Sequence, residues 1–212
     1  MLRLPEMLLN DHQHEQMQGA AKTMAVPCTH LDDLTLLANI LAELLAPGDV
    51  LLLSGSLGAG KTTLTQALAR ALDVDDDQYV SSPSFALVHE YKGRLPMVHM
   101  DLYRLDRQED VEAAGLLDFF DQPAVCVVEW PDRLGGMAPA ERLDILIEHE
   151  PPEARRLHLT PQGMAWQQRM GRIAACLTEK EACLPKENAP PECGRQTKDV
   201  PVPDRHGIKK VP

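Results

Sequence analysis

Apolar residues recur along this chain at two spacings, which separate predicted helices from predicted strands. Leucines and alanines three or four residues apart predict amphipathic helices over 34–45 and 64–71. The run 49–54 is apolar between its polar ends, which is typical of a strand buried on both faces of a sheet. Pro47-Gly48 separates the first helix from this strand. A glycine-rich segment at 55–62 therefore lies between a buried strand and a helix.

The rest of the chain alternates short strands with short helices. Strands are predicted at 85–91, 97–101, 124–129, 143–149 and 156–159. The last two form a hairpin through Pro151-Pro152, and helical stretches are predicted at 109–114 and 164–177. Thr29 followed by Asp32 has the spacing of a capping box and predicts where the first helix begins. These elements predict an α/β domain with a mixed central sheet flanked by helices and no internal repeat.

The composition changes at both ends of the chain. Residues 1–24 are polar without periodicity, and residues 178–212 combine prolines and charges with few aliphatic side chains. Such segments cannot bury enough apolar surface to fold, so we expect disordered extensions over both ranges and one ordered domain over 25–177. Met24 directly precedes that domain, and we predict that it is the natural start. An intact mass that includes Met1 would contradict this prediction.

Charge, hydropathy and cysteine content indicate which partners and which compartment suit this protein. The formal net charge is -11, from 32 acidic and 21 basic residues, and such a surface repels a polyphosphate backbone. We therefore expect no direct high-affinity binding of nucleic acid, and any link to it should run through a partner protein. No run reaches the roughly 18 apolar residues of a membrane span, and no secretory signal is present, so we expect a cytoplasmic protein without membrane contact. The five cysteines lack a C-x-x-C spacing, which favours reduced thiols over a zinc site or a disulfide framework.

The segment 55–62, GSLGAGKT, has the pattern G-x-x-x-x-G-K-[ST] of a phosphate-binding loop, and it predicts that the α/β domain is P-loop NTPase-like. Its small residues let backbone N–H groups turn toward phosphate oxygens, and the N-terminus of the next helix adds its positive dipole end. Lys61 is expected to reach the β- and γ-phosphates, and the Thr62 hydroxyl to ligate Mg²⁺. The predicted nucleotide-binding residues of this segment and its flank are Gly55, Leu57, Gly58, Ala59, Gly60, Lys61, Thr62 and Thr63.

A triphosphate site also needs a carboxylate near the metal, at the end of a neighbouring strand. Asp101 ends the apolar run 97–101, and Glu129 ends the apolar run 124–129. One acid at a strand end is most simply a solvated turn residue, but two in a chain with a phosphate-binding loop favour a metal or water-positioning role. Which of them holds the metal and which orients the water stays open. Ser84 is a candidate for the hydroxyl that senses the γ-phosphate, with a turn residue as the alternative.

Four motifs together resemble the TsaE family, the small ATPases required for threonylcarbamoyladenosine modification of tRNA. They are GSLGAGKTT at 55–63, SPSF at 82–85, HMDLYRL at 99–105 and EWP at 129–131. The last three are not general features of phosphate-loop proteins, and the resemblance extends over about residues 25–159.

The resemblance implies roles for individual residues. It places Thr62 and Glu129 at the magnesium ion and makes Asp101 a further acid needed for hydrolysis. It places Trp130 beside the nucleotide. Two further residues are implied to approach the nucleotide, namely Asp32 at the start of the first helix and Arg155 near the hairpin. The implied ligands are ATP and Mg²⁺.

The resemblance also implies a partner. TsaE-like proteins bind a complex of the TsaD and TsaB type, and their ATP turnover supports repeated rounds of tRNA modification. An acidic protein suits a basic tRNA-binding partner. The chain departs from the family at two positions, with Ser56 where an acid is usual and Ser84 where threonine is usual. We expect the second change to be tolerated, and the first to affect hydrolysis more than binding, so that hydrolysis is slow without the partner.

Two other functions fit the loop. A small-molecule kinase would share it but needs an arginine-bearing lid, for which Arg104, Arg107 and Arg133 are the available side chains. A nucleotide-dependent interaction module would bind ATP with little hydrolysis, as the missing acid at Ser56 allows. His99, in a predicted strand, is expected to be packed or hydrogen-bonded rather than catalytic.

Overall fold

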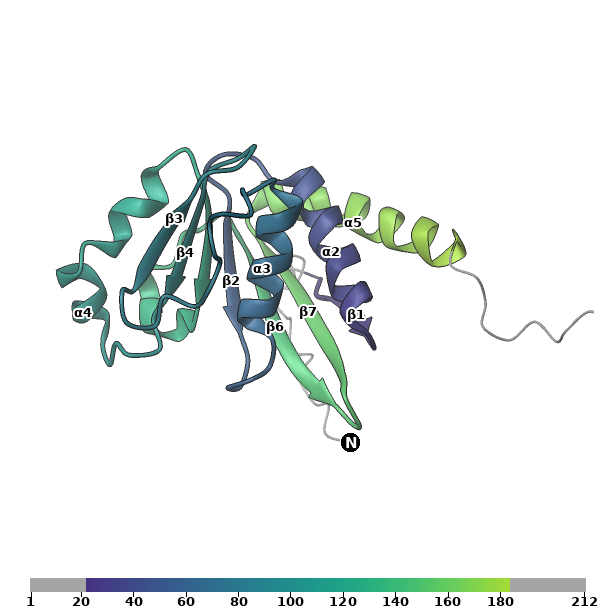
Figure 1. Cartoon of the computed structure of the whole chain (residues 1–212), viewed down its shortest axis with the longest axis horizontal. Helices are drawn as coiled ribbons and strands as arrows, with labels where there is room; N and C mark the ends of the chain where they lie inside the picture. Colours follow the sequence, from purple (N-terminus) through teal and green to yellow (C-terminus); the bar gives the residue numbers. More distant parts are fainter. Residues whose placement is uncertain (1–21, 184–212) are drawn as a thin grey trace, which may run out of the picture.

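A seven-stranded sheet organises the chain in the computed structural model, which describes residues 22–183 (Figure 1). The strands are β1 (Met24–Cys28), β2 (Val50–Ser54), β3 (Val88–Tyr91), β4 (Met97–Asp101), β5 (Val125–Glu129), β6 (Arg142–Glu150) and β7 (Ala154–Gln162). The helices are α2 (Leu31–Leu44), α3 (Lys61–Ala71), α4 (Gln108–Ala113) and α5 (Met164–Cys183), with 3-10 turns η1 (Leu116–Asp121) and η2 (Pro131–Met137). The predicted disordered extensions fall mostly on residues 1–21 and 184–212, which lie outside the described residues.

The sheet is mixed, as predicted. Its strand order is β1-β7-β6-β2-β5-β4-β3. Strands β4, β5, β2 and β6 run parallel to one another, whereas β1, β7 and β3 are antiparallel to their neighbours. The parallel strands end at one edge of the sheet, so the residues that follow β2, β4 and β5 come together there. That edge is where the sequence predicted a phosphate site.

Both faces of the sheet are covered by apolar side chains, in two separate clusters. Helices α2, α3 and α5 pack on one face, where Leu51 and Leu53 of β2 are fully buried. Elements α4, η1 and η2 cover the other face, where Val50 and Leu52 of the same strand are buried. A strand buried on both sides needs apolar residues at every position, which explains the uninterrupted run in β2.

Several elements differ from the prediction in extent. Strand β3 begins at Val88 rather than at 85, because Leu87 has a φ of 67° that breaks extended pairing. Strands β6 and β7 are longer than predicted, and α5 continues to Cys183, past the predicted end at 177. Strand β1 was not predicted at all. None of the described helices is long and apolar enough to span a membrane.

The start of α2 is capped one residue later than predicted. Asp33, not Asp32, accepts hydrogen bonds from the backbone N–H groups of Thr29 and His30, at 2.7 and 2.9 Å. The Thr29 hydroxyl also donates to the same oxygen, at 2.9 Å. These bonds satisfy donors just before the helix and fix where the chain turns from β1 into α2.

Candidate nucleotide site

The glycine-rich loop between β2 and α3 depends on backbone conformations that only glycine adopts easily. Gly55 has a φ of 145°, and a Cβ at this position would lie 2.6 Å from the backbone oxygen of Ile147. Gly60 has a φ of 112°, and a Cβ there would meet nothing within 4 Å. The first glycine therefore lets the loop pass close to β6, and the second turns the chain into α3 beside open space.

Lys61 is almost fully buried, with 5% of its surface exposed, and its ammonium folds back on the loop. Nζ donates to the carbonyl oxygens of Gly55 and Ser56, at 2.9 and 3.0 Å. It also lies 3.9 Å from the centre of the Trp130 ring. Burial lowers the pKa of Lys61, and the neighbouring Glu129 carboxylate opposes that shift. The Lys61 ammonium is thus held beside the loop by two carbonyl oxygens and an aromatic ring.

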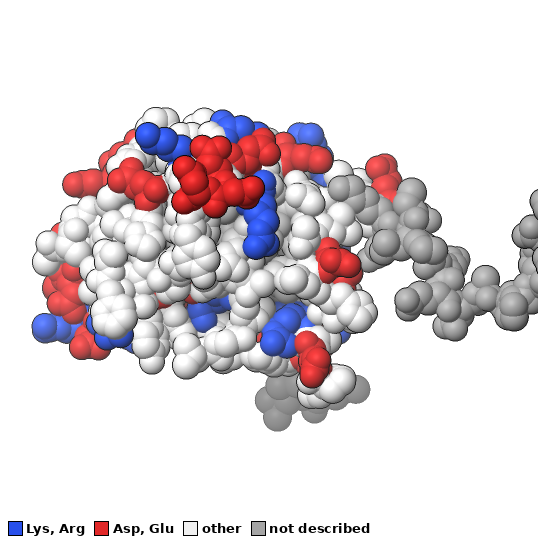
Figure 2. Space-filling view, in the orientation of Figure 1, with Lys and Arg blue, Asp and Glu red and all other residues white. Residues whose placement is uncertain are grey.

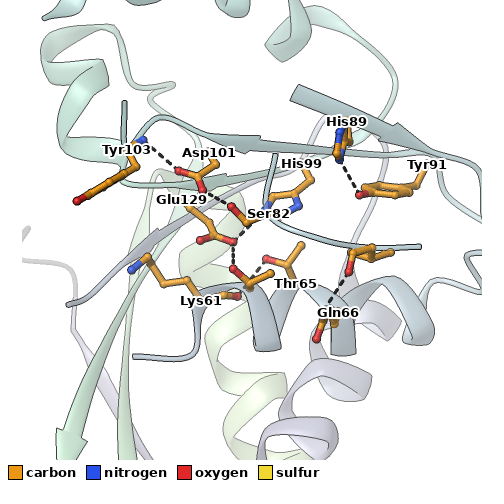
Figure 3. Close-up of polar contacts among 12 residues, drawn as sticks. Lys61, Thr65, Gln66, Ser82, His89, Tyr91, His99, Asp101, Tyr103 and Glu129 are labelled. Carbon is orange, nitrogen blue, oxygen red and sulfur yellow. Dashed lines mark hydrogen bonds and ion pairs between the residues drawn. The ribbon is translucent and has the colours of Figure 1, made fainter. Parts of the chain in front are cut away.

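The end of β5 brings Glu129 against the first turn of α3 (Figure 3). Glu129 is 3% exposed, and its Oε1 accepts a hydrogen bond from the Thr62 hydroxyl at 2.8 Å. The same oxygen lies 3.0 Å from Nε2 of His99, which is completely buried in β4. The predicted metal-binding hydroxyl and one predicted carboxylate are therefore in direct contact.

Asp101 stands beside Glu129 on the neighbouring parallel strand, paired with it in register. It is 4% exposed and accepts hydrogen bonds from the Ser82 hydroxyl and, at 3.0 Å, from the backbone N–H of Tyr103. Ser82 is thus a hydroxyl that contacts one of the two acids, and no role was predicted for it. Both carboxylates are positioned by donors from outside their own strands.

A cavity of about 400 Å³ opens in front of these groups. Its lining residues are Leu57, Gly58, Gly60, Lys61, Thr62, Thr63, Ser82, Ser84, Asp101, Tyr103, Arg104, Glu129 and Trp130. Trp130 has a φ of 60°, which turns the chain sharply after β5, and its ring centre lies 5.0 Å from that of Tyr103. Ser84 and Trp130 therefore border this cavity, and their contact with a nucleotide stays a prediction.

A second cavity of about 390 Å³ lies on the other side of the loop. It shares Gly58, Gly60 and Thr63 with the first and is bordered further by α2 and by Arg155. Arg155 Nε donates to the carbonyl oxygen of Ala59 at 3.0 Å, so the β6–β7 hairpin is tied to the loop. Asp32 is exposed in the first turn of α2 and lines neither cavity.

Acidic side chains gather above α3, at the end remote from the glycine-rich loop (Figure 2). The segment after α3 carries four exposed acids, Asp73, Asp75, Asp76 and Asp77. Helix α3 has 11 residues and is about 16 Å long, more than the screening length of about 10 Å in salt, so this cluster repels an anion at the loop only weakly. The strongly negative net charge is therefore compatible with a phosphate site.

Similar proteins identify the family of this chain. A family model described as "Threonylcarbamoyl adenosine biosynthesis protein TsaE" matches residues 28–157. The chain belongs to the TsaE family. A Bacillus subtilis (strain 168) relative named tRNA threonylcarbamoyladenosine biosynthesis protein TsaE is 40% identical over 128 residues, covering 60% of this chain and 78% of the relative. A relative of the same name from Mycobacterium tuberculosis H37Rv is 38% identical over 127 residues, covering 56% of this chain and 74% of the relative.

A solved structure is similar as well. The crystal structure of YdiB from Bacillus subtilis aligns with a TM-score of 0.63 and 31% sequence identity, covering 73% of this chain and 96% of that chain. The resemblance to TsaE that the four motifs carried is thereby confirmed, together with the α/β fold. The family model ends at residue 157, so β7 beyond that point and α5 lie outside its match.

The donors around the first cavity of this TsaE-family chain suit magnesium. The Thr62 hydroxyl and the carboxylates of Glu129 and Asp101 are oxygen ligands, which Mg²⁺ prefers. Mg²⁺ is commonly held by one or two carboxylates together with substrate phosphates. The two acids offer carboxylate ligands to the ion, and the glycine-rich loop beside them offers a place for the phosphates.

Sequence reasoning missed the partners of the two acids. His99 shares a sheet face with Asp101, since side chains two residues apart in a strand point the same way, and this alternation was readable from the sequence. Tyr103 lies in the motif HMDLYRL at 99–105, but the sequence indicated no role for it. For Ser82 no signal separated it from Ser84, because the path of the 82–87 turn decides which hydroxyl reaches Asp101.

Proposed function

We propose that this chain binds ATP with Mg²⁺ at the glycine-rich loop and hydrolyses it slowly, as an accessory protein in threonylcarbamoyladenosine modification of tRNA. The contact of Thr62 with Glu129, 2.8 Å between Oγ1 and Oε1, carries the proposal. It joins the hydroxyl of a phosphate-binding loop to a buried carboxylate, and this is the pairing that a magnesium–nucleotide site requires. Membership of the TsaE family supports the link to tRNA modification.

The two cavities suggest how ATP would lie. They meet at Gly58 and Gly60, so phosphates wrapped by the loop would separate a γ-phosphate in the first cavity from a nucleoside in the second. Backbone N–H groups of the loop and the N-terminus of α3 would hold the phosphate oxygens. Lys61 would exchange its two carbonyl partners for the β- and γ-phosphates. Arg155 borders the nucleoside side.

Glu129 and Asp101 would then have separate roles. Thr62 and Glu129 would hold Mg²⁺, which supplies positive charge to the phosphates when bound. Asp101 would orient the attacking water and take up its proton. The water oxygen forms a bond to the γ-phosphorus while the bond from that phosphorus to the bridging oxygen breaks, giving ADP and phosphate. The Ser82 and Tyr103 donors hold Asp101 in place for this task.

The partner in this proposal is a TsaD/TsaB-type complex, on which the chain would dock. Ser56 stands where the family usually has an acid, and the loss of that charge beside the phosphates is expected to slow hydrolysis in the isolated chain. The partner would complete the site and raise the rate. The exposed acids of the chain suit a basic tRNA-binding surface.

Phosphate release from ATP, measured without any acceptor molecule, tests the enzymatic part of the proposal. Slow release that needs Mg²⁺ and disappears in Lys61→Ala is expected. Release that strictly requires a small acceptor would instead indicate a kinase. Nucleotide binding without any release, alone or with the partner complex, would indicate an interaction module and would contradict the ATPase assignment.

A further inference from the structure

His99 lies at the centre of the sheet with no exposed surface, on the same face of β4 as Asp101 (Figure 3). Its Nε2 lies 3.0 Å from Glu129 Oε1. Strand pairing sets this contact, because His99 is in register with Val127, two residues before Glu129 on the adjacent strand. The imidazole is thus built into the sheet behind the carboxylate, away from the solvent-facing cavity, which it does not line.

The hydrogen-bond pattern defines which nitrogen of His99 carries the hydrogen. A carboxylate only accepts, so Nε2 must donate to Glu129 Oε1. Nδ1 is buried and has no partner among the described residues. A hydrogen on Nδ1 would be a buried donor without an acceptor, which is costly. The ring is therefore the tautomer with its hydrogen on Nε2.

Glu129 Oε1 accepts two hydrogen bonds, from Thr62 and from His99, and only the second would remain when Mg²⁺ and nucleotide bind. Thr62 is at the start of α3 and lines the cavity, so its hydroxyl would turn to the ion. His99 is enclosed on all sides and has no alternative partner among the described residues. The contact with His99 would therefore be the constant one, and it leaves Glu129 Oε2 for the cavity.

We propose that His99 is a positioning residue that fixes the carboxylate of Glu129 toward the magnesium ion through its Nε2–H. This inference rests on the proposed function, because it assigns Glu129 to the metal. His99 touches neither nucleotide nor metal. It acts as the outer partner that orients a metal ligand, and loss of such a partner typically costs about 10- to 100-fold in metal affinity or activity.

The first test uses the full chain without nucleotide or metal. Imidazole ¹⁵N spectra report which ring nitrogen is protonated, and comparison with His99→Gln assigns the His99 signals. The Nε2–H tautomer is expected in the wild type, with a changed spectrum in Glu129→Ala. A hydrogen on Nδ1, or a His99 spectrum that Glu129→Ala leaves unchanged, would overturn the assignment whether or not the protein hydrolyses ATP.

The second test compares two amide substitutions. The side-chain nitrogen of Gln can stand where Nε2 does, whereas that of Asn stands near Nδ1 and cannot reach Glu129. His99→Asn should lower kcat by about 10- to 100-fold and raise the Mg²⁺ concentration needed for half-maximal activity, with little change in KM for ATP. His99→Gln should recover most of the loss. Equal activity of the two variants would contradict a positioning role.

A matched control separates positioning from general damage to the sheet. His89 is the cross-strand neighbour of His99, and its ring contacts Tyr91 rather than Glu129. His89→Asn should leave kcat and the Mg²⁺ dependence near wild-type values. A loss in His89→Asn as large as that in His99→Asn would overturn the inference. Absence of phosphate release in the wild type would refute the proposed function. The tautomer measurement would then still decide whether His99 donates its Nε2–H to Glu129.

Discussion

Removal of the Thr62 hydroxyl should weaken nucleotide binding only when magnesium is present. Thr62→Val keeps the size of the side chain but removes the donor that lies 2.8 Å from Glu129 Oε1. When the site is loaded, that hydroxyl would turn from Glu129 to the ion, and a contact of a hydroxyl with a charged partner is worth about 1.5–3 kcal/mol. Since about 1.4 kcal/mol corresponds to a tenfold change, the loss of this hydroxyl as a metal ligand should raise the Kd for Mg·ATP by about 10- to 150-fold.

Fluorescence titration with ATP, in Mg²⁺ and separately in EDTA, measures this difference. The Kd in EDTA should stay within about twofold of the wild-type value, because the loop and Lys61 are unchanged. Thr65→Val is the matched control. Thr65 lies one turn further along α3 and donates to the carbonyl oxygen of Lys61 instead of to an acid. An equal loss of affinity in Mg²⁺ and in EDTA for Thr62→Val would refute the role of this pair in holding the metal.

Three further predictions concern the loop, the aromatic wall and the helix cap. Gly55→Ala should lower the free energy of unfolding, measured by urea titration, by more than about 2 kcal/mol. Gly58→Ala, whose Cβ would point into open space, should lower it by about 1 kcal/mol. Equal losses would contradict the close approach at Gly55. ATP binding should change the fluorescence of Trp130 because it draws Lys61 away from the ring, and an unchanged signal at saturation would argue against that movement. Burial alone would raise the pKa of Asp33, but its hydrogen bonds lower it. Asp33→Ala should therefore cost about 1 kcal/mol at neutral pH. The difference from wild type should shrink as the pH falls below about 4, the usual pKa of an aspartate, and vanish below the lowered pKa of the folded state; a difference that persists in stronger acid would contradict the cap.

The parts of the fold that the sequence predicted correctly are those set by local pattern. Continuous apolar runs located β2 and β5, and the end of each run located Glu129 and the loop. Asp101 and Glu129, each predicted at the end of a strand, are paired in register on neighbouring parallel strands.

What the sequence left open depends on contacts between distant segments. Strand β1 contains Pro27 and becomes a strand only by pairing with β7, more than a hundred residues later. Phe85 was predicted to begin a strand, yet it is 83% exposed in a turn, with Arg104 stacked on its ring. His99 could be recognised as packed and hydrogen-bonded, but its partner Glu129 could be named only once the strand order was known.

Site residues at the edge of the resemblance need direct tests. Arg155 is tied to the loop through the carbonyl oxygen of Ala59, so the predicted approach to the nucleotide has a structural basis. Asp32 has none, because the side chain is exposed and the neighbouring Asp33 caps the helix. The role of Asp32 therefore stays a prediction drawn from the family alone.

The most direct measurement of the central claim is a reconstituted modification assay. It counts the threonylcarbamoyladenosine-modified tRNAs formed per TsaD/TsaB-type complex in the presence of this chain. With ATP the complex should complete repeated rounds, whereas with a non-hydrolysable analogue, or with Lys61→Ala in place of the wild type, it should stop after a single round. Repeated rounds sustained equally by the analogue would contradict the account, because ATP hydrolysis at this site would then have no part in the reaction.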